Sequence, residues 1–137
     1  MQITFYLIDV FADRPLAGNP LAVVPQAGSL DQNSMRNIAR ELNQAETTFL
    51  LDSTRPTADW RLRCFTCGGI EVFGAGHNSL GAWWFLAESG ALNLANGQRT
   101  FTQEIGDRLL PVKIEMNGQC VGSVILTQEP PVYGQIC

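Results

Sequence analysis

The sequence predicts an α+β fold in which a curved, mostly antiparallel, barrel-like β-sheet is wrapped around a central apolar helix. Short β-rich segments recur along the chain between turn-forming residues, which is typical of a sheet built from many strands. A helical segment around residues 80–87 is apolar on nearly every face, and such a helix must be enclosed by other elements. After it, the pattern indicates only strands.

Composition places the chain among compact globular domains. Its 137 residues are 45% hydrophobic and 16% charged, so we expect a single domain over residues 1–137. The net charge is −4 and no cluster of Lys or Arg occurs, which argues against nucleic acid as a partner. The longest apolar run is far shorter than the roughly 20 residues that cross a bilayer. Because the start also lacks a basic signal-peptide region, we expect a cytoplasmic protein without a membrane partner.

The first part of the chain predicts strands and one amphipathic helix. Strands are expected at residues 3–10, 21–24 and 46–51. The helix is expected over residues 30–42, because apolar side chains from Met35 to Leu42 recur at helical spacing. Its start is expected at Ser29, since a serine followed three residues later by Gln32 is a capping-box pattern.

The second part predicts four strands and the apolar helix. The strands are expected at residues 58–65, 98–104, 109–116 and 119–127. Between the last two strands, Asn117-Gly118 is a type I′ hairpin signal. The helix is expected from Asn78 to Ser89, with Gly90 following its cap. Residues 128–137 contain two consecutive prolines and predict an extended exit or linker segment.

A glycine-rich turn, Gly74-Ala75-Gly76, leads directly into the apolar helix. The first N–H groups of a helix lack partners inside it, and glycine allows a ligand to approach the backbone closely. Such a turn is suited to hold a carboxylate or phosphate. His77, the single histidine of the chain, stands at this junction. Together with Glu46 at the start of a strand, it indicates proton-transfer chemistry on a small acid.

Cys64 and Cys67 have the C-x-x-C spacing of redox pairs and zinc sites, but their surroundings argue against both. A zinc site needs two more ligands, and the remaining candidates, Cys120, Cys137 and His77, form no second close pair. A redox pair would open a helix, whereas Cys64 stands inside a strand-like segment. We therefore expect reduced thiols and no metal site, with a thiol-redox protein as the weaker alternative.

Three stretches carry recognisable motifs, at residues 9–24, at residues 38–49, and at residues 63–66 together with 76–81. In this order they resemble the signatures of the PhzF-like (phenazine-biosynthesis) isomerases. The last motif of that family usually reads Gly-His-Ala-Thr, and here Asn78 and Ser79 stand in its final two positions. The resemblance implies one half of the diaminopimelate epimerase-like fold, in which each half wraps a sheet around a central helix.

The resemblance covers only the first half of that fold. In the family the active site lies between the two halves, and the second half supplies an acidic partner and a second anion-binding helix start. The resemblance therefore implies a homodimer, or association with a second half-domain, that rebuilds the cleft. Cysteine-dependent epimerases of related fold carry a thiol just before the glycine of the helix turn. This chain has Ala75 there, which argues against a two-cysteine mechanism.

The resemblance also implies roles for individual residues. Glu46 corresponds to the general base and acid that moves a proton between carbons of a small unsaturated carboxylic acid, and His77 to a histidine that contacts substrate or relays the proton. No cofactor and no metal are implied. Substrate-binding positions are expected at Asn19, Gly76, Asn78 and Ser79.

Two hypotheses of function follow, and simpler structural roles stand beside them. In the first, the chain is a PhzF-like isomerase that needs a dimer to complete its cleft; in the second, it is a non-catalytic half-domain that binds a small anion or a protein partner. Glu46 alone also fits a solvent-facing strand residue, His77 a packing residue and Asn19 a turn former. Asn78 or Ser79 would then cap the helix instead of binding substrate.

Overall fold

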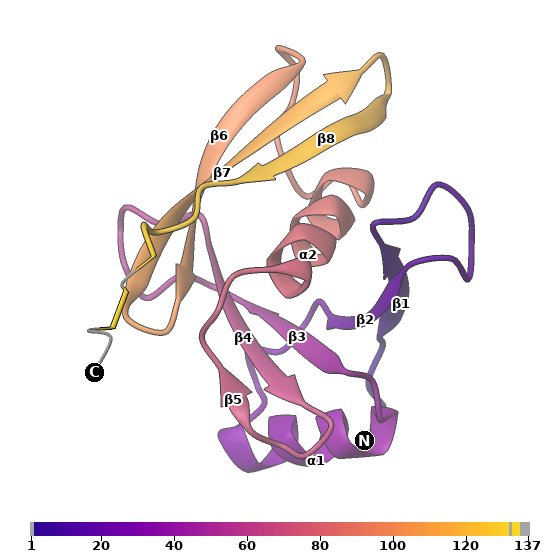
Figure 1. Ribbon diagram of the computed structural model, residues 1–137, viewed down its shortest axis with the longest axis vertical. Helices are drawn as coiled ribbons and strands as arrows, with labels where there is room; N and C mark the ends of the chain where they lie inside the picture. Colours follow the sequence, from indigo (N-terminus) through magenta and orange to yellow (C-terminus); the bar gives the residue numbers. More distant parts are fainter. Residues whose placement is uncertain (1, 132, 135–137) are drawn as a thin grey trace.

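The computed structural model describes residues 2–131 and 133–134, which form one curled sheet and two helices (Figure 1). The helices are α1 (Gln32–Leu42) and α2 (His77–Glu88). The strands are β1 (Tyr6–Val10), β2 (Asn19–Val24), β3 (Glu46–Leu51), β4 (Trp60–Thr66), β5 (Glu71–Val72), β6 (Gln98–Ile105), β7 (Arg108–Asn117) and β8 (Cys120–Leu126). Their order in the sheet is β1-β2-β3-β4-β6-β7-β8, and β5 pairs with β4.

The sheet is mixed. The pairs β2–β3 and β4–β6 are parallel, while the other neighbours are antiparallel. Each parallel pair is joined through a helix, α1 in the first case and α2 in the second, because parallel strands need a long crossover. The predicted α+β class and curved sheet are confirmed, and the two parallel pairings are the part that the strand pattern did not reveal.

Helix α2 lies against both ends of the sheet, because the edge strands β1 and β8 each contact it (Figure 1). Trp83 is completely buried, and its indole N–H donates a 2.9 Å hydrogen bond to Oε1 of Gln103. Leu86 is buried on the same helix, whereas Trp84 is 38% exposed. One side of α2 is therefore open in this structure.

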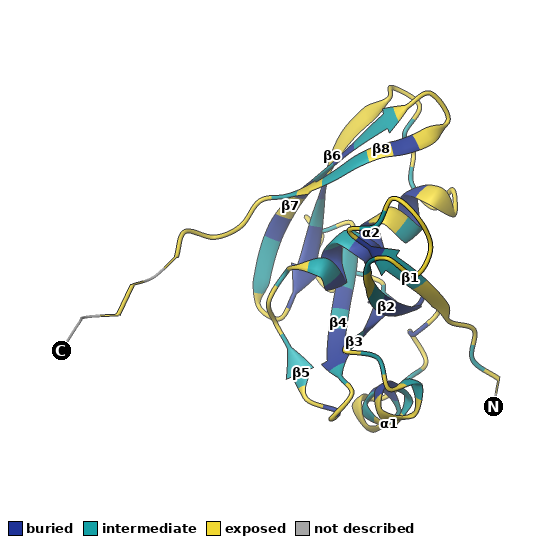
Figure 2. Ribbon diagram, turned by 45° about the vertical axis from the view of Figure 1, so that its right-hand side comes forward, coloured by how far each residue is buried: buried dark blue, intermediate teal, exposed yellow. Residues whose placement is uncertain are grey.

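Alternation along the central strands divides the core into two clusters. Val23 and Leu50 pack with Trp83 on the face toward α2. The intervening positions, including Phe49, pack with Met35 of α1 on the opposite face. In Figure 2 much of β3 and β4 is dark blue at the centre of the molecule, and α2 is dark blue only in part. The two faces of β3 thus serve two different helices.

The ends of α1 correct one prediction. Asp31, not Ser29, is the N-cap, and its Oδ1 accepts a 2.7 Å hydrogen bond from the backbone N–H of Ser34. The predicted capping box from Ser29 to Gln32 is therefore wrong. At the other end Asn43 takes the left-handed conformation, with φ of 51°, and its backbone N–H donates a hydrogen bond to the carbonyl of Ala39.

The turns after α2 and β7 test two further predictions. Gly90 has φ of 75° directly after the cap residue Ser89, as predicted for a helix end. The β7–β8 hairpin is also present, but Asn117 pairs with Cys120, so the two-residue loop begins at Gly118. Only Gly118 in this loop has a positive φ, which fits a type II′ turn, and the predicted type I′ turn is wrong.

The chain after β8 carries no helix or strand in residues 128–131 and 133–134, and Figure 2 shows it leaving the sheet as an exposed segment. The remaining positions of the predicted exit segment, 132 and 135–137, lie outside the described residues. The short strand β5 had no counterpart in the prediction. Neither helix in the described part combines the length and apolar character needed to cross a membrane.

Candidate active site

Glu46 reaches the candidate site because of its place in β3. It is the first residue of the strand and shares the pleat face of Thr48 and Leu50, the face that packs toward α2. The strand interior is buried, whereas the side chain of Glu46 keeps 22% of its surface exposed. A carboxylate is therefore presented at the rim of the core, beside the start of α2.

His77 meets this carboxylate from the first position of α2. Its Nδ1 lies 3.3 Å from Oε2 of Glu46, and the two side chains are 15% and 22% exposed. The other ring nitrogen, Nε2, is buried and has no hydrogen-bond partner in the described part of the chain. The predicted pair is thus brought together, slightly beyond the roughly 2.6–3.2 Å of a direct proton transfer, and a small side-chain adjustment would close the gap.

The side chain of Asn78 organises the turn before α2. Its Oδ1 accepts hydrogen bonds from the backbone N–H of Gly76 at 2.7 Å and of Ser79 at 2.8 Å, and its Nδ2 donates to the carbonyl of Gly74 at 2.9 Å. Asn78 therefore fills the role of a cap from inside the helix. The N–H groups of His77 and Asn78 donate to no other described residue.

The predicted substrate-binding positions differ in whether their backbone N–H groups are already hydrogen-bonded within the chain. The backbone donors of Gly76 and Ser79 are already engaged, and Ser79 is completely buried. Of the three predicted backbone donors of the turn, only that of Asn78 has no partner in the described residues, and Asn78 itself is 2% exposed. Asn19 is exposed at the start of β2, where it pairs with Val10, and it lies outside the lining of the pocket that holds Glu46.

A pocket of about 440 Å³ opens in front of the Glu46–His77 pair. One wall is the turn and start of α2, and the opposite wall comes from β7 and the segment after β8. The lining residues are Glu46, Gly74, Ala75, Gly76, His77, Asn78, Arg108, Leu110, Gln128, Glu129 and Pro130.

Arg108 and Gln128 of this pocket were missed by sequence reasoning. The Arg108 guanidinium donates through Nη2 to the carbonyl of Phe73, and its Nη1 lies 2.8 Å from Oε2 of Glu129. The side chain of Gln128 donates to the carbonyl of Ala75 at 2.6 Å. Both residues contact the turn across 35 and 53 positions of the chain, so no local motif marks them.

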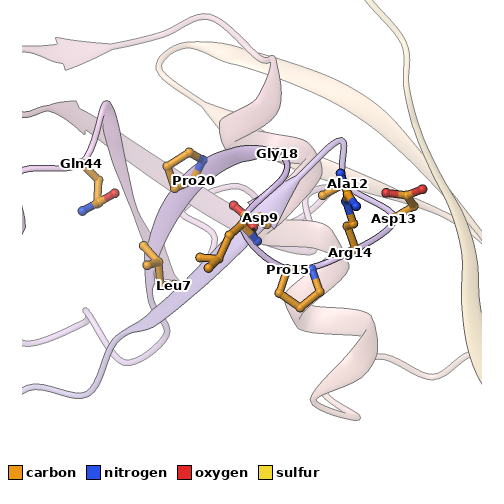
Figure 3. A pocket seen from close by; sticks show the side chains of 10 residues that line it. Leu7, Asp9, Ala12, Asp13, Arg14, Pro15, Gly18, Pro20 and Gln44 are labelled. Atoms are coloured by element: carbon orange, nitrogen blue, oxygen red, sulfur yellow. Dashed lines mark hydrogen bonds between the residues drawn. The ribbon is translucent and has the colours of Figure 1, made fainter.

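A second pocket, of about 690 Å³, lies beside the loop between β1 and β2 (Figure 3). Figure 3 shows most of its lining side chains along β1 and the loop that follows it, with Pro20 on β2 and Gln44 on a separate segment. Its acids are Asp9 and Asp13, and Asp9 accepts a hydrogen bond from the backbone of Leu16 in the same loop. Among the described residues that line it there is no His and no acid–base pair, so the pocket beside Glu46 and His77 is the better candidate for proton transfer.

The thiols do not form a redox or metal centre in the described residues. Cys64 is buried in β4, and burial, followed by smaller effects that include the nearby Glu46 charge, raises the pKa of its thiol to about 12. A thiolate is therefore absent near neutral pH. Cys67 and Cys120 are exposed and unpaired. In the described part of the chain, no three His, Cys, Asp or Glu side chains gather as metal ligands would.

Comparison with known proteins gives a consistent result. The chain matches the PhzC-PhzF family, described as phenazine biosynthesis-like protein, over residues 8–135. It is 34% identical to an uncharacterised isomerase, YddE, of Salmonella typhimurium, across 99% of this chain and 45% of that protein. It is 44% identical to the trans-2,3-dihydro-3-hydroxyanthranilate isomerase of Pseudomonas chlororaphis, across 56% of this chain and 27% of that enzyme.

A solved structure supports the same assignment. The phenazine biosynthesis protein of the PhzF family from Bacillus anthracis superposes with a TM-score of 0.75 at 33% identity, covering 85% of this chain and 38% of that one. The chain spans less than half the length of these relatives. With the match to the family covering nearly its whole length, the chain belongs to the isomerase-type PhzC-PhzF family of phenazine biosynthesis-like proteins.

Proposed function

We propose that this chain moves a proton between carbons of a small unsaturated carboxylic acid, with Glu46 as the general base and acid. The observation that carries the proposal is the 3.3 Å approach of His77 Nδ1 to Glu46 Oε2 at the wall of a pocket. One relative is named as an isomerase of trans-2,3-dihydro-3-hydroxyanthranilate, which is an unsaturated carboxylate. The chemistry needs no cofactor, since a carboxylate can both remove and return the proton.

His77 assists in one of two ways that the geometry allows. A neutral imidazole that keeps its proton on Nδ1, toward Glu46, leaves Nε2 as an acceptor. Nε2 is buried and without a partner in the described residues, so it accepts a proton from substrate, or orients a substrate donor, only when the ring turns toward the pocket. Glu46 and His77 would then handle two different protons of one reaction.

The proposed enzyme needs a second copy, or a second half-domain, to close the cleft over this pair. The chain covers only 45% of YddE and 27% of the named isomerase, so the pocket walls of a full-length relative are only partly represented. Apolar side chains beside the open side of α2 support association: Trp84 is 38% exposed and Phe11 is 73% exposed, and both line a third surface pocket of about 540 Å³ between α2 and the end of β1. In a two-fold dimer each copy would contribute its own Glu46 and His77.

The second candidate function is a non-catalytic half-domain that binds a small anion or a protein partner. It is favoured by the N–H groups of His77 and Asn78 at the start of α2, which have no acceptor in the described residues and could hold a carboxylate without any reaction. In that case the chain would catalyse no reaction, and ligand binding would not depend on the basicity of Glu46.

The test measures deuterium incorporation from D₂O into trans-2,3-dihydro-3-hydroxyanthranilate by mass spectrometry, alongside the native mass of the chain at micromolar concentration. The variant Glu46→Gln keeps the shape of the side chain and removes its basicity. We expect it to slow exchange by about a hundredfold or more, which is the usual contribution of a positioned general base. Glu41→Gln, an equal charge change on an exposed position of α1, should leave the rate unchanged.

The two candidates predict different results. A dimer with exchange that depends on Glu46 supports the isomerase. A monomer without exchange, in which Glu46→Gln binds the same acid as tightly as the unmodified chain, overturns it and supports the binding module.

A further inference from the structure

We propose that Arg108 binds the carboxylate of the ligand in the Glu46 pocket, and that the chain's own Glu129 competes with the ligand for it. The inference rests on the proposed function, because it names the residue that would select an acid as substrate. It starts from the position of a guanidinium in the same pocket as Glu46 and His77.

The position of Arg108 is fixed from two sides. Its backbone begins β7, and its Nη2 donates to the carbonyl of Phe73 just before the turn into α2. The side chain keeps 32% of its surface exposed, so the guanidinium is held in place but still reachable from the pocket. Guanidinium groups bind carboxylates in defined planar geometry, which makes Arg108 a directional receptor for an acid.

Glu129 shows that a carboxylate fits at this receptor. Its Oε2 lies 2.8 Å from Nη1 of Arg108, and 53% of its side chain is exposed. An ion pair this open to solvent contributes little stability. A ligand that offers a carboxylate and also fills the pocket is therefore expected to bind Arg108 more strongly than the Glu129 side chain does.

The segment that carries Glu129 is held across the pocket by a second contact. The neighbouring Gln128 donates to the carbonyl of Ala75 at 2.6 Å, and Pro130 also lines the pocket. This anchoring keeps the Glu129 carboxylate close to Arg108, which gives an internal competitor a high effective concentration. Removing the carboxylate of Glu129 should thus strengthen ligand binding, an effect that a purely structural ion pair would not produce.

The test titrates the 137-residue chain with sorbate, a small unsaturated carboxylate, and with sorbamide, its uncharged amide, by isothermal calorimetry. We expect sorbate to bind and sorbamide not to bind. Glu129→Gln should tighten sorbate binding about two- to fivefold, the range set by an exposed ion pair. Arg108→Gln should weaken it about tenfold or more, as expected when a charge-assisted hydrogen bond is lost.

Two further variants control for charge and folding. Glu115→Gln makes the same charge change as Glu129→Gln in an exposed pair with Lys113, outside the pocket, and should leave the affinity unchanged. Arg108→Lys keeps the positive charge and should restore part of the affinity. Each variant is compared with the unmodified chain by its thermal unfolding curve, so that affinities are read only from folded protein.

Several results would overturn the inference: no sorbate binding to either the unmodified chain or Glu129→Gln, equal affinity in folded Arg108→Gln, or weaker binding in Glu129→Gln. These results are distinct from failure of the proposed function. Sorbate binding that depends on Arg108, without any deuterium exchange, would overturn the proposed isomerase activity and support the carboxylate site. Exchange that depends on Glu46, together with sorbate binding that does not change in Arg108→Gln, would support the isomerase and overturn the carboxylate site at Arg108.

Discussion

The hydroxyl of Thr48 lies 3.5 Å from the carbonyl oxygen of Asn78 and so joins β3 to the first turn of α2. Thr48 follows Glu46 by two residues on the same face of β3, and Asn78 follows His77 directly. The same hydroxyl lies 3.6 Å from Sγ of Cys64 and, with a single hydrogen, donates to one of these acceptors at a time. This contact ties together the two elements that carry the proposed acid–base pair.

Replacing Thr48 with valine should uncouple those elements. The change removes the hydroxyl of a completely buried residue with little change in shape. We expect the free energy of unfolding, measured in urea by tryptophan fluorescence, to fall by about 1 kcal/mol. Deuterium exchange should fall more than this loss of stability explains, because the distance between Glu46 and His77 is no longer held.

Thr48→Ser is the matched control, since it keeps the hydroxyl and loses only a methyl group. It should lose some stability but retain the exchange rate. Full activity in Thr48→Val would show that the hydroxyl does not position the pair.

Gly81 allows α2 to approach the N-terminal strands closely. A Cβ at this position would lie 2.6 Å from Cδ2 of Leu21 and 2.8 Å from Cγ2 of Val10, and both neighbours are buried. In an open helix, Gly→Ala stabilises by about 1 kcal/mol. Here overpacking costs about 1–3 kcal/mol, so we expect Gly81→Ala to be destabilising overall.

The comparison that isolates this effect is Gly81→Ala in a background where Leu21 is shortened to alanine. If crowding is the cause, the substitution should be less costly there than in the unmodified chain, as a double-mutant cycle in thermal unfolding would show. Equal costs in the two backgrounds would contradict the packing explanation.

The motif resemblance predicted that Glu46 and His77 share one site, and the sequence pattern placed each residue at or next to the start of an element. The glycine-rich turn fixed where α2 begins, and the apolar run after Glu46 fixed where β3 begins. The motif resemblance then linked two elements that are distant in the chain. What it left open was which N–H groups of the turn are free, since that depends on the rotamer of Asn78.

Arg108 shows why the rest of the site could not be predicted. It follows a tight turn at Gly106, and nothing in its neighbourhood differs from an ordinary exposed arginine. Its contact with Phe73 joins residues 35 positions apart in the chain, and no local pattern encodes such a contact. The N-cap of α1 failed for a different reason: Ser29 and Asp31 are both good caps, and only the backbone geometry selects Asp31.

Cys64 should be unreactive in the folded chain. It is completely buried, and the raised pKa of its thiol leaves almost no thiolate at neutral pH. In a titration with a thiol-specific reagent, Cys64→Ala should leave the number of rapidly reacting thiols unchanged and lower the number in denatured protein by one. Cys67→Ala should lower the rapid number instead, because Cys67 is exposed. Rapid labelling that disappears in Cys64→Ala would revive the redox alternative.

Glu104 is a buried carboxylate that fastens the loop between β3 and β4 to β6. It is 3% exposed, and it accepts hydrogen bonds from the backbone N–H and the hydroxyl of Thr54, at 2.8 Å and 2.5 Å, and from Ser53 at 3.1 Å. Arg61 lies 3.7 Å away. Burial alone raises the pKa of Glu104, but the hydrogen bonds and the Arg61 charge outweigh it, so the pKa lies below its ordinary value of 4.5.

The sign of the resulting pH dependence follows from this lowered pKa. A carboxyl group that releases its proton more readily when folded stabilises the protein fully above the unfolded pKa, near 4.5, and loses that contribution as the pH falls through the folded pKa. Glu104→Gln should therefore lower the free energy of unfolding by about 1–3 kcal/mol at pH 7, since a charged acceptor is lost. The difference from the unmodified chain should stay constant down to about pH 5 and shrink below pH 4.5. Asp52→Asn, at an exposed position in the same loop, should show little difference at any pH, and a Glu104 effect that grows in acid would contradict the assignment.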